Sequence, residues 1–175
     1  MEAEQKRYPI GHFKPLDNIS TSARANYSME IARLVPTLQE MLRHLNAEEL
    51  RMPYRKNGWT VQQVVHHMAD NDMNALIRLK RALTEEEPQA SSYREDLWAE
   101  LNDYRDTPVQ ISMNLLESVH YRLMKVLEGL KPIDFEKRLS TEVLGMITVD
   151  IALQRFIWHN KHHAAQIRSV IERLK

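Results

Sequence analysis

Four long stretches of this chain repeat apolar residues at steps of three and four, and this periodicity limits the fold more than any other feature. They cover residues 21–45, 61–83, 108–130 and 149–174 of the 175-residue sequence. Such spacing places the apolar side chains on one face of an α-helix. Four amphipathic helices, with connections that let neighbours run antiparallel, predict an all-α fold: a four-helix bundle with short extra helices in its connections.

Residues typical of helix ends stand at the borders of these stretches. Thr60 and Thr148 are suited to cap the second and fourth helices, because a hydroxyl accepts a hydrogen bond from a free backbone N–H. Thr107 followed by Pro108 predicts the start of the third helix, with proline in its first turn. Pro36 lies inside the first helix, so we expect a kink or a broken turn near Leu34.

The remaining segments are shorter and more irregular. Residues 8–15 hold two prolines and a glycine, which predicts an arm without helix. Residues 93–104 favour a shorter helix, and residues 143–147 suit an extended backbone, but we expect negligible strand content. The length is typical of one domain, so residues 1–175 are interpreted as a single metal-binding bundle.

Composition removes several classes of function. Lys+Arg and Asp+Glu balance at 24 each, which gives no basic field for nucleic acid and no strong attraction to anionic lipid. Cysteine is absent, which excludes disulfides and thiolate chemistry, and the four glycines are too scattered for a phosphate-binding loop. No apolar run approaches the roughly 20 residues of a membrane helix. We expect a soluble cytoplasmic protein with neither nucleic acid nor membrane as partner.

Chemistry is concentrated in the last helix, where the sequence reads WHNKHH from Trp158. His159 and His163 are four residues apart, so both imidazoles leave the same helix face, in the middle of an otherwise apolar stripe. Burying them without partners would cost roughly 1–3 kcal/mol each. A divalent metal ion would satisfy both, since neutral imidazole is a common metal ligand.

The second helix offers a third ligand. Val64, His67, Asn71 and Asn74 share a face, and this polar row on a core-facing helix indicates a wet cavity. We therefore predict that His67, His159 and His163 hold one metal ion. Single histidines are more often merely hydrogen-bonded, and that group comprises His12, His44 and His120. His162 faces another side of the last helix and is incidental to the site. Asn160 stands where a zinc protease would carry its glutamate, so WHNKHH is not that signature.

Several short motifs are similar to one known family. They are GWTV with VVHHMAD around His67, the arm YPIGHFKP, Pro53-Tyr54-Arg55, and the WHNKHH segment. Together they resemble the YfiT branch of the DinB-like four-helix-bundle proteins over nearly the whole chain. The resemblance implies one zinc or nickel ion on His67, His159 and His163, a homodimer, and a metal-dependent hydrolase that acts on a small molecule. One departure is Gln166, where related sequences often carry a further histidine.

Three ligands leave a coordination position open, as in catalytic zinc sites, where bound water has a pKa lowered towards about 7. Asp70 is the candidate carboxylate or base near the metal, with a salt bridge or an exposed position as its alternative. Asn71, Asn74 and Arg78 are candidate pocket residues. Relatives also resemble bacillithiol S-transferases, so a metal-dependent transferase for a low-molecular-weight thiol is the first alternative. A non-catalytic, stress-associated metal-binding bundle is the second alternative; a fourth protein ligand would favour it.

Overall fold

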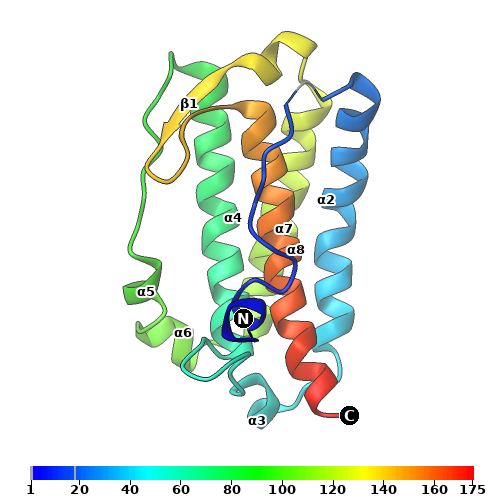
Figure 1. The fold of residues 1–175 in the computed structure, drawn as a ribbon, viewed down its shortest axis with the longest axis vertical. Helices are drawn as coiled ribbons and strands as arrows, with labels where there is room; N and C mark the ends of the chain where they lie inside the picture. Colours follow the sequence, from blue (N-terminus) through cyan, green and yellow to red (C-terminus); the bar gives the residue numbers. More distant parts are fainter. Residues whose placement is uncertain (1, 18) are drawn as a thin grey trace.

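Four long helices stand side by side as a bundle in the computed structural model, which describes residues 2–17 and 19–175 (Figure 1). They are α2 (Thr21–Leu42), α4 (Val61–Thr84), α7 (Val109–Glu128) and α8 (Val149–Arg173). The predicted four-helix bundle is confirmed. Among the described residues, no helix is long and apolar enough to cross a membrane.

The order of the helices around the bundle differs from the simplest arrangement. The main contacts join α2 to α7 and α8, and α4 to the same two helices, so α2 and α4 lie diagonally opposite. In Figure 1, α4 and α7 run parallel, because the connection between them travels back along the length of the bundle. The expectation that neighbours run antiparallel is therefore wrong for this pair. The returning connection passes alongside α4, and this path positions part of the site.

The returning connection carries two short helices instead of the single helix expected over residues 93–104. These are α5 (Glu95–Trp98) and α6 (Asn102–Asp106). They are separated because Leu101 adopts an extended backbone conformation, with φ −71° and ψ 159°. A further short helix, α3 (Ala47–Leu50), follows α2.

The predicted caps agree with the structure at two of three helix starts. The Thr60 hydroxyl accepts from Gln63 N at 3.1 Å, and the Gln63 side chain accepts from Thr60 N at 2.9 Å. The Thr148 hydroxyl accepts from Ile151 N and caps α8. Helix α7 begins one residue later than predicted, with Pro108 at its N-cap and no side-chain cap, so Thr107 does not cap it.

Helix α2 continues through Pro36 to Leu42 without an interruption. The broken-turn alternative predicted near Leu34 is therefore wrong, and the helix ends three residues before the expected residue 45. Its start is capped by Ser20, whose hydroxyl accepts from Ala23 N.

A small β-hairpin lies between α7 and α8, after the 3₁₀ turn η1 (Pro132–Glu136). Strands β1 (Arg138–Thr141) and β2 (Gly145–Thr148) pair antiparallel, with Leu139 opposite Ile147. These two side chains are buried in the core, which fixes the register of the pair. The expectation of negligible strand content is thus wrong here. The expected extended segment begins at Gly145, whose φ of +66° suits the turn.

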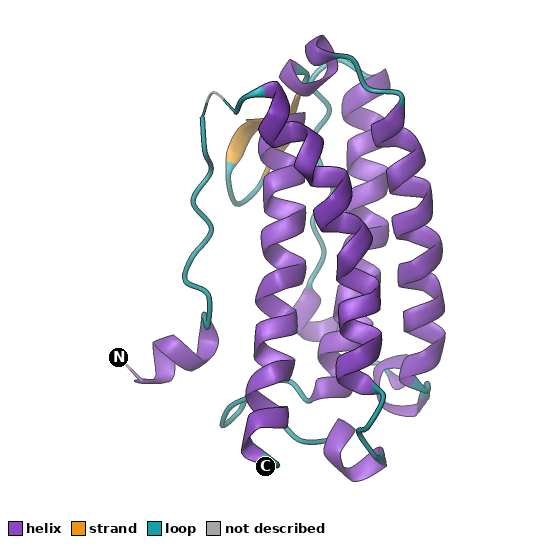
Figure 2. Ribbon diagram, turned by 90° about the vertical axis from the view of Figure 1, so that its right-hand side faces the viewer, coloured by secondary structure: helices purple, strands orange, loops and turns teal. Residues whose placement is uncertain are grey.

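The N-terminal segment lies along the outside of the bundle (Figure 2). Helix α1 (Glu2–Arg7) is followed by residues without helix, as predicted for residues 8–15. This arm is attached to α8: the Gln154 side chain bonds both the backbone N and the backbone O of Leu16. Phe13 also packs against Trp158, with ring centroids 5.9 Å apart.

The apolar core is divided into two clusters along the bundle. One contains Leu76 and Leu79 of α4 with Leu153 and Phe156 of α8. The other contains residues nearer the start of α4 and the end of α8, including Val64 and Ile167. Between the two clusters both helices carry buried polar residues. This polar layer contains the candidate site.

Candidate metal centre

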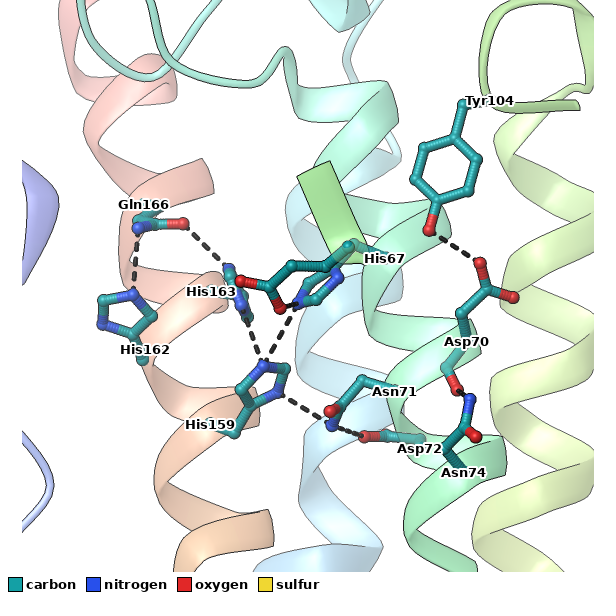
Figure 3. Close-up of polar contacts among 11 residues, drawn as sticks. His67, Asp70, Asn71, Asp72, Asn74, Tyr104, His159, His162, His163 and Gln166 are labelled. Carbon is teal, nitrogen blue, oxygen red and sulfur yellow. Dashed lines mark hydrogen bonds and ion pairs between the residues drawn. The ribbon is translucent and has the colours of Figure 1, made fainter. Parts of the chain in front are cut away.

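Three imidazoles meet in the polar layer, one from α4 and two from α8 (Figure 3). The Nε2 atoms of His67 and His159 are 3.2 Å apart, and those of His163 and His159 are 3.1 Å apart. One ligand atom from each ring lies within 4.8 Å of the other two. The trio that the sequence predicted is therefore brought together. We call His67, His159 and His163 the histidine trio.

The spacing within the histidine trio fits a metal ion better than mutual hydrogen bonding. A neutral imidazole nitrogen has either one N–H or one lone pair, so His159 Nε2 can satisfy only one of its two neighbours. A tetrahedral zinc ion with Zn–N bonds of about 2.0–2.1 Å places its ligand nitrogens about 3.3 Å apart. The observed separations of 3.1 and 3.2 Å are close to that value. The donor set suits zinc or nickel.

Burial keeps the histidine trio in the state that binds metal. All three side chains are buried, and His67 is 1% exposed. Desolvation lowers the pKa of His67 to about 3, and it lowers the pKa values of His159 and His163 well below the ordinary value of 6.5. The rings are thus neutral at pH 7 and keep a lone pair for a cation.

Two amide side chains contact rings of the histidine trio. Oε1 of Gln166 lies 2.8 Å from His163 Nδ1 and can accept its proton, which leaves Nε2 free as a ligand. The Asn71 amide nitrogen lies 3.1 Å from His159 Nδ1 and donates to the Asp72 carboxylate at 3.3 Å. His67 Nδ1 is buried and has no hydrogen-bond partner.

Gln166 also connects the site to the N-terminal arm. Its Nε2 donates to the backbone oxygen of Arg7 at 3.0 Å and lies 2.9 Å from His162 Nε2. In the sequence, Gln166 was noticeable only as the place of a missing histidine. His162 stacks on Trp158, with ring centroids 4.8 Å apart, and it lies outside the histidine trio.

The other predicted site residues divide into two groups. Asp70 and Asn74 are turned away from the histidine trio in Figure 3. Asp70 accepts a 2.6 Å hydrogen bond from the Tyr104 hydroxyl, and Asn74 donates to the backbone oxygen of Asp70. The contacts of Asp70 give no support to a role beside the metal. Asn71 and Arg78, by contrast, line a cavity next to the site, whereas Asn74 does not.

This cavity has a volume of about 640 Å³ and reaches His159. It lies between α4, α8, the β-hairpin and the returning connection. The volume is in the range of small-molecule sites, which is about 300–1,000 Å³. Its wall combines buried apolar side chains with a few polar ones, among them Arg78, Tyr93, Glu95 and Arg155.

Among the described residues, Glu95 carries the carboxylate nearest to the histidine trio, and sequence reasoning missed it. Its Oε2 is 3.9 Å from His67 Nε2. The side chain is 60% exposed, yet partial burial raises the pKa of its carboxyl group above the ordinary value. No local pattern marks this residue, because it reaches the site only through the path of the returning connection.

A second buried polar cluster lies beside the histidine trio, and the sequence contained a signal for it. Asp72 interrupts the apolar stripe of α4 between Met68 and Leu76 and is 0% exposed. Its carboxylate accepts from His120 Nε2 at 2.6 Å and from Asn160 Nδ2 at 3.0 Å. We call Asp72, His120 and Asn160 the Asp72 cluster.

The remaining histidines have ordinary partners or lie at the surface. His66 points away from His67, and its ring nitrogens contact the Ser112 hydroxyl and the Thr107 backbone oxygen. His12 contacts Glu4, and His44 is exposed.

The sequence and the fold of this chain are shared with known proteins. The family model of the DinB superfamily matches residues 30–167, and the chain belongs to this superfamily. A relative from Oceanobacillus iheyensis, named "putative metal-dependent hydrolase", is 41% identical over 96% of this chain and 97% of its own. One from Bacillus mycoides with the same name is 40% identical over 96% of each chain.

Solved structures agree with this assignment. YfiT from Bacillus subtilis, described as "a probable metal-dependent hydrolase with an unusual four-helix bundle topology", superimposes with a TM-score of 0.94. It is 34% identical, and the match covers 97% of this chain and 98% of that one. The four-helix bundle protein TT2238 matches with a TM-score of 0.58 at 17% identity, which shows the fold alone.

Proposed function

We propose that this protein is a metal-dependent hydrolase whose metal, zinc or nickel, is held by His67, His159 and His163. The observation that carries the proposal is the convergence of three neutral Nε2 atoms at the end of an open cavity. When bound, such an ion supplies a Lewis acid that lowers the pKa of water near a substrate carbonyl. The names of the relatives support the same reaction class.

The residues of the chain supply orientation and proton transfer. Gln166 holds the His163 ring by its Nδ1 atom, so the Nε2 atom of that ring keeps its direction. Glu95 Oε2, at 3.9 Å from His67 Nε2, lies where it can accept the proton of the attacking water and return it to the leaving group. Buried apolar side chains form part of the cavity wall beside the site.

A fourth protein ligand would favour the non-catalytic alternative. Asp70, the candidate for that role, is bonded to Tyr104 instead. Among the described residues, Glu95 is the other carboxylate within reach, and Glu95→Gln separates its two possible roles. We expect this variant to keep its metal and to lose about 10²–10⁴-fold in kcat. Loss of metal together with activity would instead identify Glu95 as a ligand.

The decisive experiment offers esters and amides to the metal-loaded protein, with and without a low-molecular-weight thiol. We expect hydrolysis without thiol, and none in His159→Ala. Consumption of substrate only when the thiol is present would overturn the hydrolase and favour the thiol transferase. We also propose, on family resemblance, that the protein is a homodimer, which light scattering of the purified protein tests.

A further inference from the structure

Arg155 is a cation on the wall of the cavity with no anion to bind. It precedes His159 by one helical turn on α8, so both side chains leave the same face. Its guanidinium is half-buried, and burial lowers its pKa. Among the described residues, none forms a hydrogen bond or an ion pair with it. Five N–H donors are therefore available on a group that has already lost part of its hydration.

The guanidinium of Arg155 is held in place by aromatic rings. It lies 4.5 Å from the ring centroid of Trp158 and 5.5 Å from that of Phe13, which the N-terminal arm supplies. These two cation–π contacts restrain the guanidinium, while its N–H groups form no hydrogen bond with any described residue. An arginine fixed in this way loses little conformational freedom when an anion binds.

Arg78, Tyr93 and Glu95 are among the other polar side chains on this wall, and they differ in whether they already have a hydrogen-bond partner in the protein. Arg78 already donates to the backbone oxygen of Ser91 through two nitrogens. Tyr93 contributes a buried hydroxyl without a partner, which makes it a second free donor. Glu95 exerts an electrostatic influence on Arg155 but forms no ion pair with it. A nearby carboxylate disfavours a dianion such as phosphate more than a monoanion.

The rest of the cavity suits a hydrocarbon group. Its wall contains the buried side chains of Leu79, Leu123, Leu139, Ile147, Leu153 and Phe156. These belong to the apolar cluster at the hairpin end of the bundle. A molecule that fills this space gains from the burial of each methylene.

We propose that the cavity binds a small amphipathic monocarboxylate, with Arg155 pairing with the carboxylate and the apolar wall enclosing the hydrocarbon part. A planar guanidinium edge matches a carboxylate in a two-point contact. Arg155 and His159 are one turn apart, about 5–6 Å between their Cβ atoms. This inference rests on the proposed function, because it treats the monocarboxylate as the substrate of the hydrolase. The short distance between Arg155 and His159 then places the bond that is hydrolysed close to the carboxylate end of the substrate.

Binding can be measured without turnover. Metal-loaded protein is titrated calorimetrically, in a buffer free of carboxylate and phosphate, with octanoate and with the neutral octanamide. We expect the wild type to prefer octanoate about tenfold or more, since a hydrogen bond to a charged group is worth that much. Affinity should rise about fourfold per methylene from butanoate to octanoate. Arg155→Gln should remove the preference for the anion and leave octanamide binding unchanged.

Two further variants make the result specific. Arg168→Gln changes an exposed arginine on the same helix and should bind octanoate as the wild type does. His159→Ala tests whether the carboxylate binds the metal instead. A preference that survives in Arg155→Gln but disappears in His159→Ala would overturn the assignment, as would an Arg155→Gln protein that has lost its metal. A wild type that binds neither probe would overturn it as well.

Failure of this inference is distinguishable from failure of the proposed function. If the protein binds octanoate through Arg155 but hydrolyses no ester or amide, the binding site is supported and the hydrolase is refuted. If the protein hydrolyses neutral esters but does not bind octanoate, the hydrolase is supported and the carboxylate site is refuted.

Discussion

Two buried polar clusters lie side by side in the bundle, and they differ in whether their members complement one another. In the Asp72 cluster a carboxylate meets N–H donors from His120 and Asn160, at 2.6 and 3.0 Å. In the histidine trio three imidazole nitrogens face each other, and no acid is among them. Complementary groups satisfy each other, whereas three like groups need a cation from outside.

This difference separates a cluster that stabilises the fold from one that binds a ligand. At its edge, the Asp72 cluster leaves His120 Nδ1 and Asn160 Oδ1 without a partner in the protein. The clusters touch through Asn71, whose Nδ2 lies 3.3 Å from Asp72 Oδ1 and 3.1 Å from His159 Nδ1. Substitutions in the histidine trio should therefore change the metal content, whereas substitutions in the Asp72 cluster should change the stability of the fold. The predictions below run from the largest expected effect to the smallest.

The largest effect is expected for the histidine trio. His67→Ala, His159→Ala and His163→Ala should each reduce bound metal from about one ion per chain to nearly none, because two imidazoles hold zinc or nickel far less tightly than three. Elemental analysis of the purified proteins measures this, with circular dichroism to show that the helices remain. His44→Ala, at an exposed position, is the matched control and should keep its metal. Full metal content in all three variants would refute the site.

Asp72→Ala should show the opposite pattern. Removal of the carboxylate leaves the His120 ring and the Asn160 amide without their buried acceptor. Each buried donor that is left without its acceptor costs about 1–3 kcal/mol. Denaturant unfolding of the metal-free protein measures the change, and the variant should still bind metal when it is folded. A change below 1 kcal/mol would mean that the Asp72 cluster does not stabilise the fold.

The contrast between the clusters also shows what sequence can predict. Helix periodicity predicted the four long helices, and i,i+4 spacing predicted that His159 and His163 would share a face; both come from local geometry. The Asp72 cluster was missed even though Asp72 interrupts an apolar stripe, because a charge there is recognised only with its partner on another helix. The parallel course of α4 and α7, and with it Glu95 at the site, depends on tertiary packing that no local pattern encodes.

A smaller effect is expected for Gln166, which orients one ring of the histidine trio. Gln166→Ala removes the acceptor of His163 Nδ1 and should weaken metal affinity about 10–100-fold, the usual cost of losing a group that orients a ligand. Competition with a chromophoric chelator measures the affinity. Gln166→Glu restores an acceptor and should recover most of the loss. Equal affinity in wild type and Gln166→Ala would show that the ring is held by packing alone.

The smallest effect concerns Asp70, on the flank of α4 that faces Tyr104 instead of the histidine trio. Burial raises the pKa of its carboxyl group, and the hydrogen bond from Tyr104 opposes that shift. The folded state therefore holds this proton more tightly than the unfolded state does. Its contribution to stability is fully present below the unfolded pKa of 3.8 and is lost as the pH rises through the folded pKa. At neutral pH the charged Asp70 thus costs stability.

Asp70→Asn removes this charge and keeps an oxygen for the Tyr104 hydroxyl. We expect a gain in the free energy of unfolding at pH 7 of less than about 1 kcal/mol, since the group is only partly buried. The gain should shrink as the pH falls towards 3.8. Urea unfolding at several pH values measures it, with Asp106→Asn as an exposed control whose charge does not act on Asp70. Metal content should not change. If Asp70→Asn instead loses metal while remaining folded, Asp70 acts on the histidine trio, and the separation of the two faces of α4 is wrong.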